Sequence, residues 1–266
     1  MKHVIITGGS SGIGFALARL YVERGWRVSL IARRATLLNE AVLELQRLSN
    51  EHAGRVHGES ADVSDEAELH QAVERCEAAF GPCDLLVTSA GQVEPALFLE
   101  TSSAQFNAQV STNLLGTANA IRTVYRGMVA RGRGQIMVVS SAAAWIGIHG
   151  YSAYCASKSA LIGFVEALRA EAKANGITVS ICFPPDTLTP QYQAELPKRS
   201  GAAKALMGGQ KPWPVEAVAS RILCAADQRK DTVHFGFQLT MLSYFGPLLK
   251  PILYWWADKQ LMKEAR

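Results

Sequence analysis

The sequence VIITGGSSGIG, from Val4 to Gly14, runs from an apolar strand through a glycine-rich turn into the start of a helix. Gly8 and Gly12 can take backbone angles that are closed to other residues, and they let a pyrophosphate approach the main chain. The N–H groups that open the following helix then face the phosphate charge. A turn of this kind also forms without a ligand. The prediction is a nucleotide-phosphate site made by Gly8, Ser10, Ser11, Gly12, Ile13 and Gly14.

A second group of residues supplies a hydrogen-bond donor, a phenol and a cation. Ser141 is followed thirteen residues later by Tyr154, and Lys158 comes four residues after that. Tyr154 and Lys158 share one face of a predicted helix, where an ammonium lowers the pKa of a phenol that otherwise titrates near pH 10. We expect Ser141 to hydrogen-bond a substrate carbonyl oxygen while Tyr154 donates the proton.

Together the two motifs resemble the short-chain dehydrogenase/reductase family, and the match covers roughly two thirds of the chain, from Thr7 through Thr189. The resemblance implies that Lys158 also holds the nicotinamide ribose and that Asn113 holds a water in a proton relay. It further implies cofactor contacts from Asp62, Val63, Ala90, Gly91, Pro184, Thr187 and Thr189, with the threonine hydroxyls bonding the nicotinamide amide or the phosphates. Two plainer roles remain open, since Asp62 can cap a helix and Asn113 can bond to the backbone.

Two neighbouring residues compete for the catalytic roles. Tyr151 is also a phenol, but it lies seven residues from Lys158, which is about 10 Å along a helix axis. Ser140 precedes Ser141, and strand alternation points only one of the two side chains into the site. The family's spacing of thirteen residues to Tyr154 favours Ser141.

Six apolar, β-branched runs alternate with helical patterns, at residues 4–7, 28–32, 55–60, 85–89, 135–140 and 177–183. Because these runs are apolar on both faces, they predict an α/β fold with one doubly wound parallel sheet of Rossmann type and helices on both faces. Such sheets bind ligands at the carboxyl ends of their strands. We expect one catalytic domain over residues 1–236, with a mobile flap at 190–214, and an apolar C-terminal extension over 237–266.

The cofactor preference depends on the residues that follow the second strand. A carboxylate about 20 positions beyond the glycine turn would accept hydrogen bonds from the adenosine ribose and select NAD. The chain has Arg33 and Arg34 there instead. Guanidinium groups give a phosphate forked, charged hydrogen bonds, so the pair favours the 2′-phosphate of NADP. The alternative for either arginine is a solvated loop before the next helix.

The stretch PPDTLTP, residues 184–190, taken with the glycine turn and Arg33, resembles the branch of this family that reduces 3-ketodihydrosphingosine. The expected activity is therefore NADPH-dependent reduction of a long-chain amino ketone in sphingolipid synthesis. A reductase of another apolar ketone, of the steroid or 3-oxoacyl type, is an alternative because fold and catalytic residues do not fix the substrate. A catalytically silent NADP-binding regulatory protein is a second alternative, against which the complete catalytic set argues.

Residues 239–256 read LTMLSYFGPLLKPILYWW, an apolar and aromatic run interrupted by Pro247, Lys250 and Pro251. The run barely reaches the length needed to span a bilayer. Paired tryptophans followed by basic residues favour peripheral membrane contact or a rim for an apolar substrate. A dimer contact or a tail packed on the core is the alternative. We also expect a homo-oligomer.

Composition argues against several other classes of protein. The formal charge of +4 on 266 residues comes without a basic cluster interleaved with aromatics, so nucleic-acid binding is not expected. The five cysteines are scattered, without a C-x-x-C pair or clustered histidines, which argues against a disulfide framework and a metal site. The first apolar strand starts at about His3 and leaves no room for a signal peptide, so we expect a cytoplasmic protein.

Overall fold

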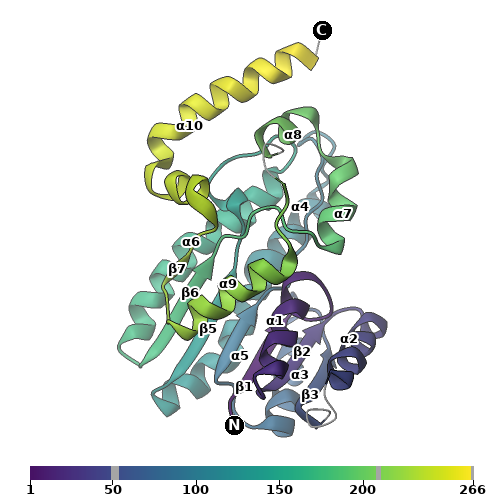
Figure 1. Ribbon diagram of the computed structural model, residues 1–266, viewed down its shortest axis with the longest axis vertical. Coiled ribbons are helices and arrows are strands. Elements are labelled where there is room, and N and C mark those ends of the chain that lie inside the picture. Colours follow the sequence, from purple (N-terminus) through teal and green to yellow (C-terminus); the bar gives the residue numbers. More distant parts are fainter. Residues whose placement is uncertain (49–53, 208–210, 265–266) are drawn as a thin grey trace.

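The structure, a computed structural model, describes residues 1–48, 54–207 and 211–264, with side chains up to residue 259. Within these ranges, seven parallel strands form a single sheet in the order β3-β2-β1-β4-β5-β6-β7 (Figure 1). The sheet grows in opposite directions from the β1–β4 pair at its centre. This is the predicted doubly wound arrangement, in which ligands bind where the strand order reverses.

The strands are β1 (His3–Thr7), β2 (Arg27–Ala32), β3 (Val56–Ser60), β4 (Leu85–Thr88), β5 (Gly134–Val139), β6 (Ile177–Cys182) and β7 (Thr232–Val233). The first six agree with the predicted runs to within one residue at each end. The sequence does not predict β7, because two residues are too few to show an alternating pattern.

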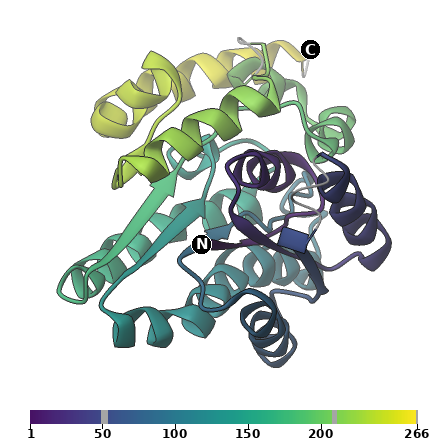
Figure 2. The same cartoon turned by 60° about the horizontal axis from the view of Figure 1, so that its bottom comes forward.

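Alternate side chains of β1 enter different layers of the molecule. Val4 and Ile6 pack in a core with α1 (Gly12–Glu23), α2 (Ala35–Arg47) and α9 (Val215–Asp227). Ile5 packs on the opposite face with α3 (Glu66–Phe80), α5 (Gly116–Arg131) and α6 (Ser152–Lys173). Helices therefore cover both faces of the sheet (Figure 2), which is why its strands are apolar on both sides.

Short helices occupy connections beyond the carboxyl ends of the strands. The helix α4 (Ser103–Val110) continues through a π-helical turn (Ser111–Leu115) into α5, and a 3-10 turn (Ala142–Ala144) follows β5. The expected flap at 190–214 contains α7 (Pro190–Glu195), a 3-10 turn (Leu196–Lys198) and α8 (Gly201–Met207), while residues 208–210 lie outside the described part. The flap is largely helical because two of its prolines stand at helix starts, where proline is tolerated.

The apolar extension forms one long helix, α10 (Gly236–Glu264), which is drawn in yellow in Figure 1. Its backbone leaves helical geometry at Phe245, two residues before Pro247, and the helix bends there. The helix packs against α8, and its C-terminal part extends away from the sheet (Figure 1). Within the described ranges, none of the helices has both the length and the apolarity needed to cross a membrane.

Candidate active site

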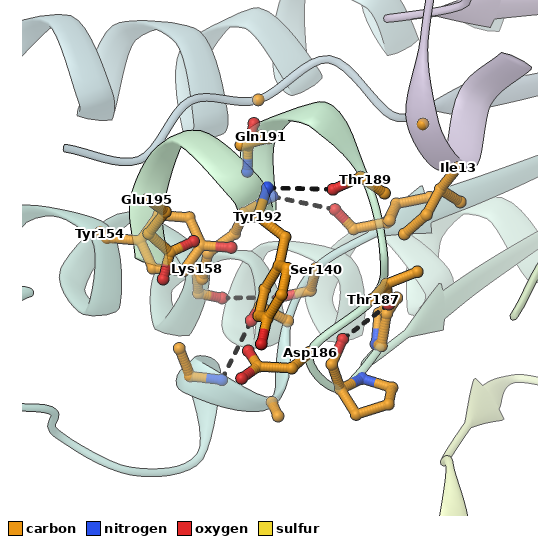
Figure 3. A pocket seen from close by; sticks show the side chains of 18 of the residues that line it. Ile13, Ser140, Tyr154, Lys158, Asp186, Thr187, Thr189, Gln191, Tyr192 and Glu195 are labelled. Carbon is orange, nitrogen blue, oxygen red and sulfur yellow. Dashed lines mark hydrogen bonds between the residues drawn. The ribbon is translucent and has the colours of Figure 1, made fainter. Parts of the chain in front are cut away.

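A cavity of about 1000 Å³ lies beyond the carboxyl ends of the strands, and part of its wall is shown in Figure 3. Its wall includes the glycine turn, the loops after β2 to β6, and residues of α6, α7, α8 and α10. All the predicted site residues line it except Gly14 and Asn113. Gly14 packs on the carbonyl of Gly8, where a side chain would clash. The topology thus brings both sequence motifs to one cavity.

The glycine turn has the geometry of a phosphate site. Gly8 and Gly12 have positive φ angles of 69° and 57°, which residues with a Cβ rarely adopt. A Cβ on Gly8 would lie 2.6 Å from the backbone nitrogen of Ala90. Ser11 is the N-cap of α1, yet its side chain makes no capping hydrogen bond, so it leaves the first N–H groups of the helix uncapped. These donors and the helix dipole fit a phosphate group.

Arg33 and Arg34 follow β2 and are exposed at the cavity. Arg33 Nη1 lies 3.4 Å from Asp62 Oδ2. Asp62 does not cap α3, whose N-cap is Asp65; instead it accepts hydrogen bonds from the N–H and hydroxyl of Ser64, at 2.9 and 2.7 Å. Partial burial acts to raise the pKa of Asp62, but the Ser64 hydrogen bonds and the charge of Arg33 outweigh it and hold the pKa below its ordinary value.

Tyr154 lies in the first turn of α6, and its side chain is hydrogen-bonded to that of Ser141. Ser141 Oγ also accepts a hydrogen bond from the Ala143 N–H at 3.1 Å, which fixes the position of this oxygen. Burial raises the pKa of Tyr154 above its ordinary value, and the hydrogen bond from Ser141 offsets only part of this effect. A raised pKa keeps the phenol protonated, which is the form that a proton donor requires.

Lys158 approaches the face of the Tyr154 ring, and its expected lowering of the pKa of Tyr154 stays a prediction. Lys158 Nζ lies 5.9 Å from the centroid of the Tyr154 ring and donates its hydrogen bond to the Val139 carbonyl, at 3.1 Å. Burial of the ammonium lowers the pKa of Lys158 to about 8, so the side chain still carries most of its positive charge at neutral pH. Desolvation therefore dominates the titration of both residues.

Ser140 and Tyr151, which compete with Ser141 and Tyr154 for the catalytic roles, form hydrogen bonds to other groups. The hydroxyl of Ser140 donates to the Lys158 carbonyl at 3.1 Å, so it faces α6. The hydroxyl of Tyr151 donates to Glu195 Oε1 at 2.6 Å. Ser141 and Tyr154 are thus the pair whose hydroxyls meet in the cavity.

Asn113 is fully buried in the π-helical turn between α4 and α5. Its Nδ2 donates to the Gln92 carbonyl and to Ser157 Oγ, both at 2.9 Å, and its Oδ1 accepts from the Gln92 N–H at 2.8 Å. The amide therefore ties the loop after β4 to α6. This bonding to the backbone is the plainer of the two roles left open by the sequence, and π-helical turns of this kind often occur at functional sites.

The remaining cofactor candidates are Val63, Ala90, Gly91, Pro184, Thr187 and Thr189, which all line the cavity. The Thr187 hydroxyl donates to the Pro185 carbonyl at 2.8 Å, and Thr189 Oγ1 accepts from the Tyr192 N–H at 3.2 Å as the N-cap of α7. The hydrogen of the Thr187 hydroxyl is thus already committed to the backbone, whereas that of Thr189 is still available to a ligand. The methyl group of Thr189 would lie 3.2 Å from a Cβ on Gly12, which brings the loop after β6 against the glycine turn.

The cavity wall also contains a buried ion cluster that the sequence does not predict. The side chain of Arg199 is 3% exposed and donates to both oxygens of Asp186, at 2.5 and 2.8 Å. It also contacts Glu195 Oε1, at 3.0 Å from Nε and 2.8 Å from Nη2. Glu195 and Arg199 are four residues apart, a spacing typical of helical ion pairs, but nothing in the sequence pairs them with Asp186.

Known proteins are similar to this chain over most of its length. A family model described as short chain dehydrogenase matches residues 2–200. A 3-dehydrosphinganine reductase of Danio rerio is 34% identical over 251 residues, 94% of this chain and 76% of the relative. The Arabidopsis thaliana 3-dehydrosphinganine reductase TSC10B is 37% identical over 248 residues, 91% of this chain and 73% of the relative.

Solved structures have the same fold. The crystal structure of a single-residue variant of actinorhodin polyketide ketoreductase with NADPH superposes with a TM-score of 0.80 at 26% identity, covering 90% of this chain and 97% of the other.

Proposed function

Because the chain belongs to the short-chain dehydrogenase/reductase family, and is thus an oxidoreductase with a nicotinamide cofactor, we propose that it reduces the ketone of 3-ketodihydrosphingosine with NADPH. The observation that carries the proposal is the similarity, over 94% of the chain, to a 3-dehydrosphinganine reductase. The meeting of Ser141 and Tyr154 in one cavity with Lys158 supports it. A long-chain ketone needs catalytic residues next to its carbonyl group and a long apolar channel for its alkyl chain.

The chain's own residues account for the proton and the orientation of the ketone. When bound, the reduced nicotinamide supplies the hydride. The Tyr154 hydroxyl donates its proton to the carbonyl oxygen, which becomes the alcohol oxygen of the product. The Ser141 hydroxyl donates a hydrogen bond to the same oxygen as negative charge develops on it. Lys158 Nζ, held at the Val139 carbonyl, keeps a positive charge near the phenol and would hold the nicotinamide ribose.

The choice of NADPH over NADH follows from the charges at the end of β2. Arg33 and Arg34 line the cavity there, and no carboxylate follows β2 directly in the sequence. Asp62 comes from the loop after β3 and is paired with Arg33. A 2′-phosphate would replace this weak, exposed ion pair with charged hydrogen bonds to the guanidinium groups.

The far wall of the cavity suits an aliphatic chain. Apolar side chains of α8 and α10 form it, among them Leu206, Met207, Leu242, Leu249, Ile252 and Leu253. Burying a long alkyl chain here contributes roughly 0.8 kcal/mol for each CH₂ group. The same wall would accept a steroid or a 3-oxoacyl chain, so it supports an apolar ketone without selecting among these substrates.

An assay of NADPH consumption over a panel of ketones tests the proposal. The panel contains 3-ketodihydrosphingosine, a steroid ketone and a 3-oxoacyl thioester, each also tested with NADH. The expected result is the highest kcat/KM with the first ketone and NADPH. Faster reduction of another ketone would replace the substrate proposal, and no oxidation of NADPH with any ketone would favour the silent regulatory protein.

We further propose that α10 contacts the membrane surface peripherally, because one face of the helix borders the cavity while another is apolar and exposed. Leu249, Ile252 and Leu253 line the cavity. Leu248 and Trp255, on the same helix, are 74% and 60% exposed. A ketone dissolved in a bilayer would meet the apolar wall of the cavity next to such a contact. A face buried between two copies of this chain in a homo-oligomer is the competing proposal.

A further inference from the structure

The cluster on Asp186, Glu195 and Arg199 carries a surplus of one negative charge, since two carboxylates pair with one guanidinium. Lys158 and Lys211 also line the cavity. Among the residues described, neither forms an ion pair with the two carboxylates, and Lys158 Nζ is bonded to a carbonyl instead. Uncompensated charge in a partly buried site is costly, so this wall favours a cationic ligand.

The hydrogen bonds of Glu195 leave one of its oxygens to the cavity. The Tyr151 hydroxyl, Arg199 Nε and Arg199 Nη2 all converge on Oε1, at 2.6, 3.0 and 2.8 Å. No residue in the described part of the chain donates a hydrogen bond to Oε2. Because Glu195 lines the cavity and its side chain is only 10% exposed, Oε2 is an acceptor positioned for a ligand rather than for bulk water.

The surplus charge lies within electrostatic reach of the proton donor. Beyond the effect of burial, the charges of Glu195 and Asp186 both raise the pKa of Tyr154. Figure 3 shows Tyr154, Glu195 and Asp186 on the same cavity wall, with the Tyr192 ring among them. The centroid of the Tyr192 ring lies 5.0 Å from Arg199 Cζ, a cation–π contact that helps to hold the guanidinium between the two carboxylates.

We infer that Asp186 and Glu195 bind the protonated amine of an α-amino ketone, with Arg199 as the positioning residue that holds both carboxylates. The inference rests on the proposed function, and it names the feature of the substrate that this site selects. In an α-amino ketone the amine is on the carbon next to the carbonyl carbon. Glu195 and Tyr154 line the same cavity. An ammonium bound at Glu195 Oε2 would therefore hold the neighbouring carbonyl group on the side of Tyr154. Steroid and 3-oxoacyl ketones have no such cation.

The test compares 3-ketodihydrosphingosine with the same long-chain ketone lacking the amine. In the wild type, kcat/KM should be higher for the amino ketone. Glu195→Gln keeps the shape of the side chain but removes its charge, and we expect it to lower kcat/KM for the amino ketone roughly ten- to hundredfold, mainly through KM, and to change the other ketone less than about threefold. Asp186→Asn should act in the same direction.

Two further variants separate charge from structure. Glu195→Asp keeps the negative charge and should retain much of the preference for the amino ketone. Glu166→Gln, an exposed position on the outer part of α6, is the matched control and should change neither ketone. Circular dichroism and NADPH binding establish that each variant is folded.

A direct binding measurement makes the result independent of turnover. Dihydrosphingosine and its analogue without the amine are titrated into the NADP-loaded protein while tryptophan fluorescence is followed. Tighter binding of dihydrosphingosine than of its analogue, with the difference lost in Glu195→Gln, supports the ammonium site. If this result is found but neither ketone is reduced, only the proposed reductase activity fails. Equal binding of the two ligands, or equal loss of both in Glu195→Gln, overturns the ammonium site and leaves ketone reduction standing.

Discussion

Arg33 Nη1 and Asp62 Oδ2 lie 3.4 Å apart, and they join the end of β2 to the loop after β3 across 29 positions of sequence. The sequence suggested a separate cofactor contact for each residue. In the structure they form one charged pair at the cavity. The Arg33 side chain is 64% exposed, so this pair contributes little to stability and can rearrange around a ligand phosphate.

Replacing Arg33 by alanine should reduce the preference for NADPH. The variant loses a charged hydrogen bond to the 2′-phosphate, so NADPH binding should weaken by about 1.5 to 3 kcal/mol while NADH binding stays nearly unchanged. Titration of each nucleotide by fluorescence measures the difference. Arg19→Ala, an exposed arginine of α1 paired with Glu23, is the control. Equal weakening of both nucleotides would remove the phosphate role from Arg33.

Replacing Tyr154 by phenylalanine should abolish turnover and leave nucleotide binding intact, because the change removes only the hydroxyl that donates the proton. Tyr151→Phe should keep most of kcat, since its hydroxyl is committed to Glu195. Steady-state kinetics with a saturating ketone and NADPH measures both variants. A Tyr154→Phe enzyme with near-normal kcat would show that another group supplies the proton.

Protonation of His3 should make the fold less stable in acid. His3 is buried between the Gly81 carbonyl and Ser29 Oγ, at 2.8 Å from each, and burial lowers its pKa from 6.5 to about 4. The unfolded chain therefore binds a proton that the folded chain does not between these two values, so stability falls as pH falls through this window.

Urea unfolding of the wild type and His3→Gln measures this effect. Between about pH 7 and pH 5 the wild type should lose about 2 kcal/mol more of its unfolding free energy than the variant. Glutamine can hydrogen-bond to both partners of His3 but does not titrate, which makes it the matched replacement. Parallel pH curves for the two proteins would mean that His3 titrates alike in the folded and unfolded states.

Polar substitution of the exposed face of α10 should reduce binding to lipid vesicles. Serine at Phe245, Leu248, Trp255 and Trp256 removes apolar side chains that do not line the cavity, so the site itself stays intact. This is a sharper change than deletion of residues 237–266, which would also remove part of the cavity wall. Co-sedimentation with anionic vesicles should fall, and kcat/KM should fall more for a long-chain ketone in vesicles than for a short soluble one.

The control for this prediction is Leu43→Ser, on α2, where the leucine is 50% exposed. It should sediment like the wild type. Unchanged sedimentation of the four-residue variant, together with a smaller species in size-exclusion chromatography, would instead assign this face to contact between copies of the chain.

The first six strands, the glycine turn and the spacing of Ser141, Tyr154 and Lys158 are predictable from the sequence, because each depends on residues close together in the chain. Alternation of apolar side chains and the conformational freedom of glycine are local properties. The expected contacts of Thr187 and Asn113 were less predictable, since both side chains can bond to the backbone as readily as to a ligand.

Which charges meet and which groups lose their water depends on the three-dimensional fold. Arg199 reaches Asp186 because α7 and the turn after it fold back over the loop that follows β6, and α10 lines the cavity because it packs against α8. Burial likewise raises the pKa of Tyr154 and lowers the pKa of Lys158. Desolvation and ion pairing depend on three-dimensional neighbours, which local patterns in the sequence do not specify.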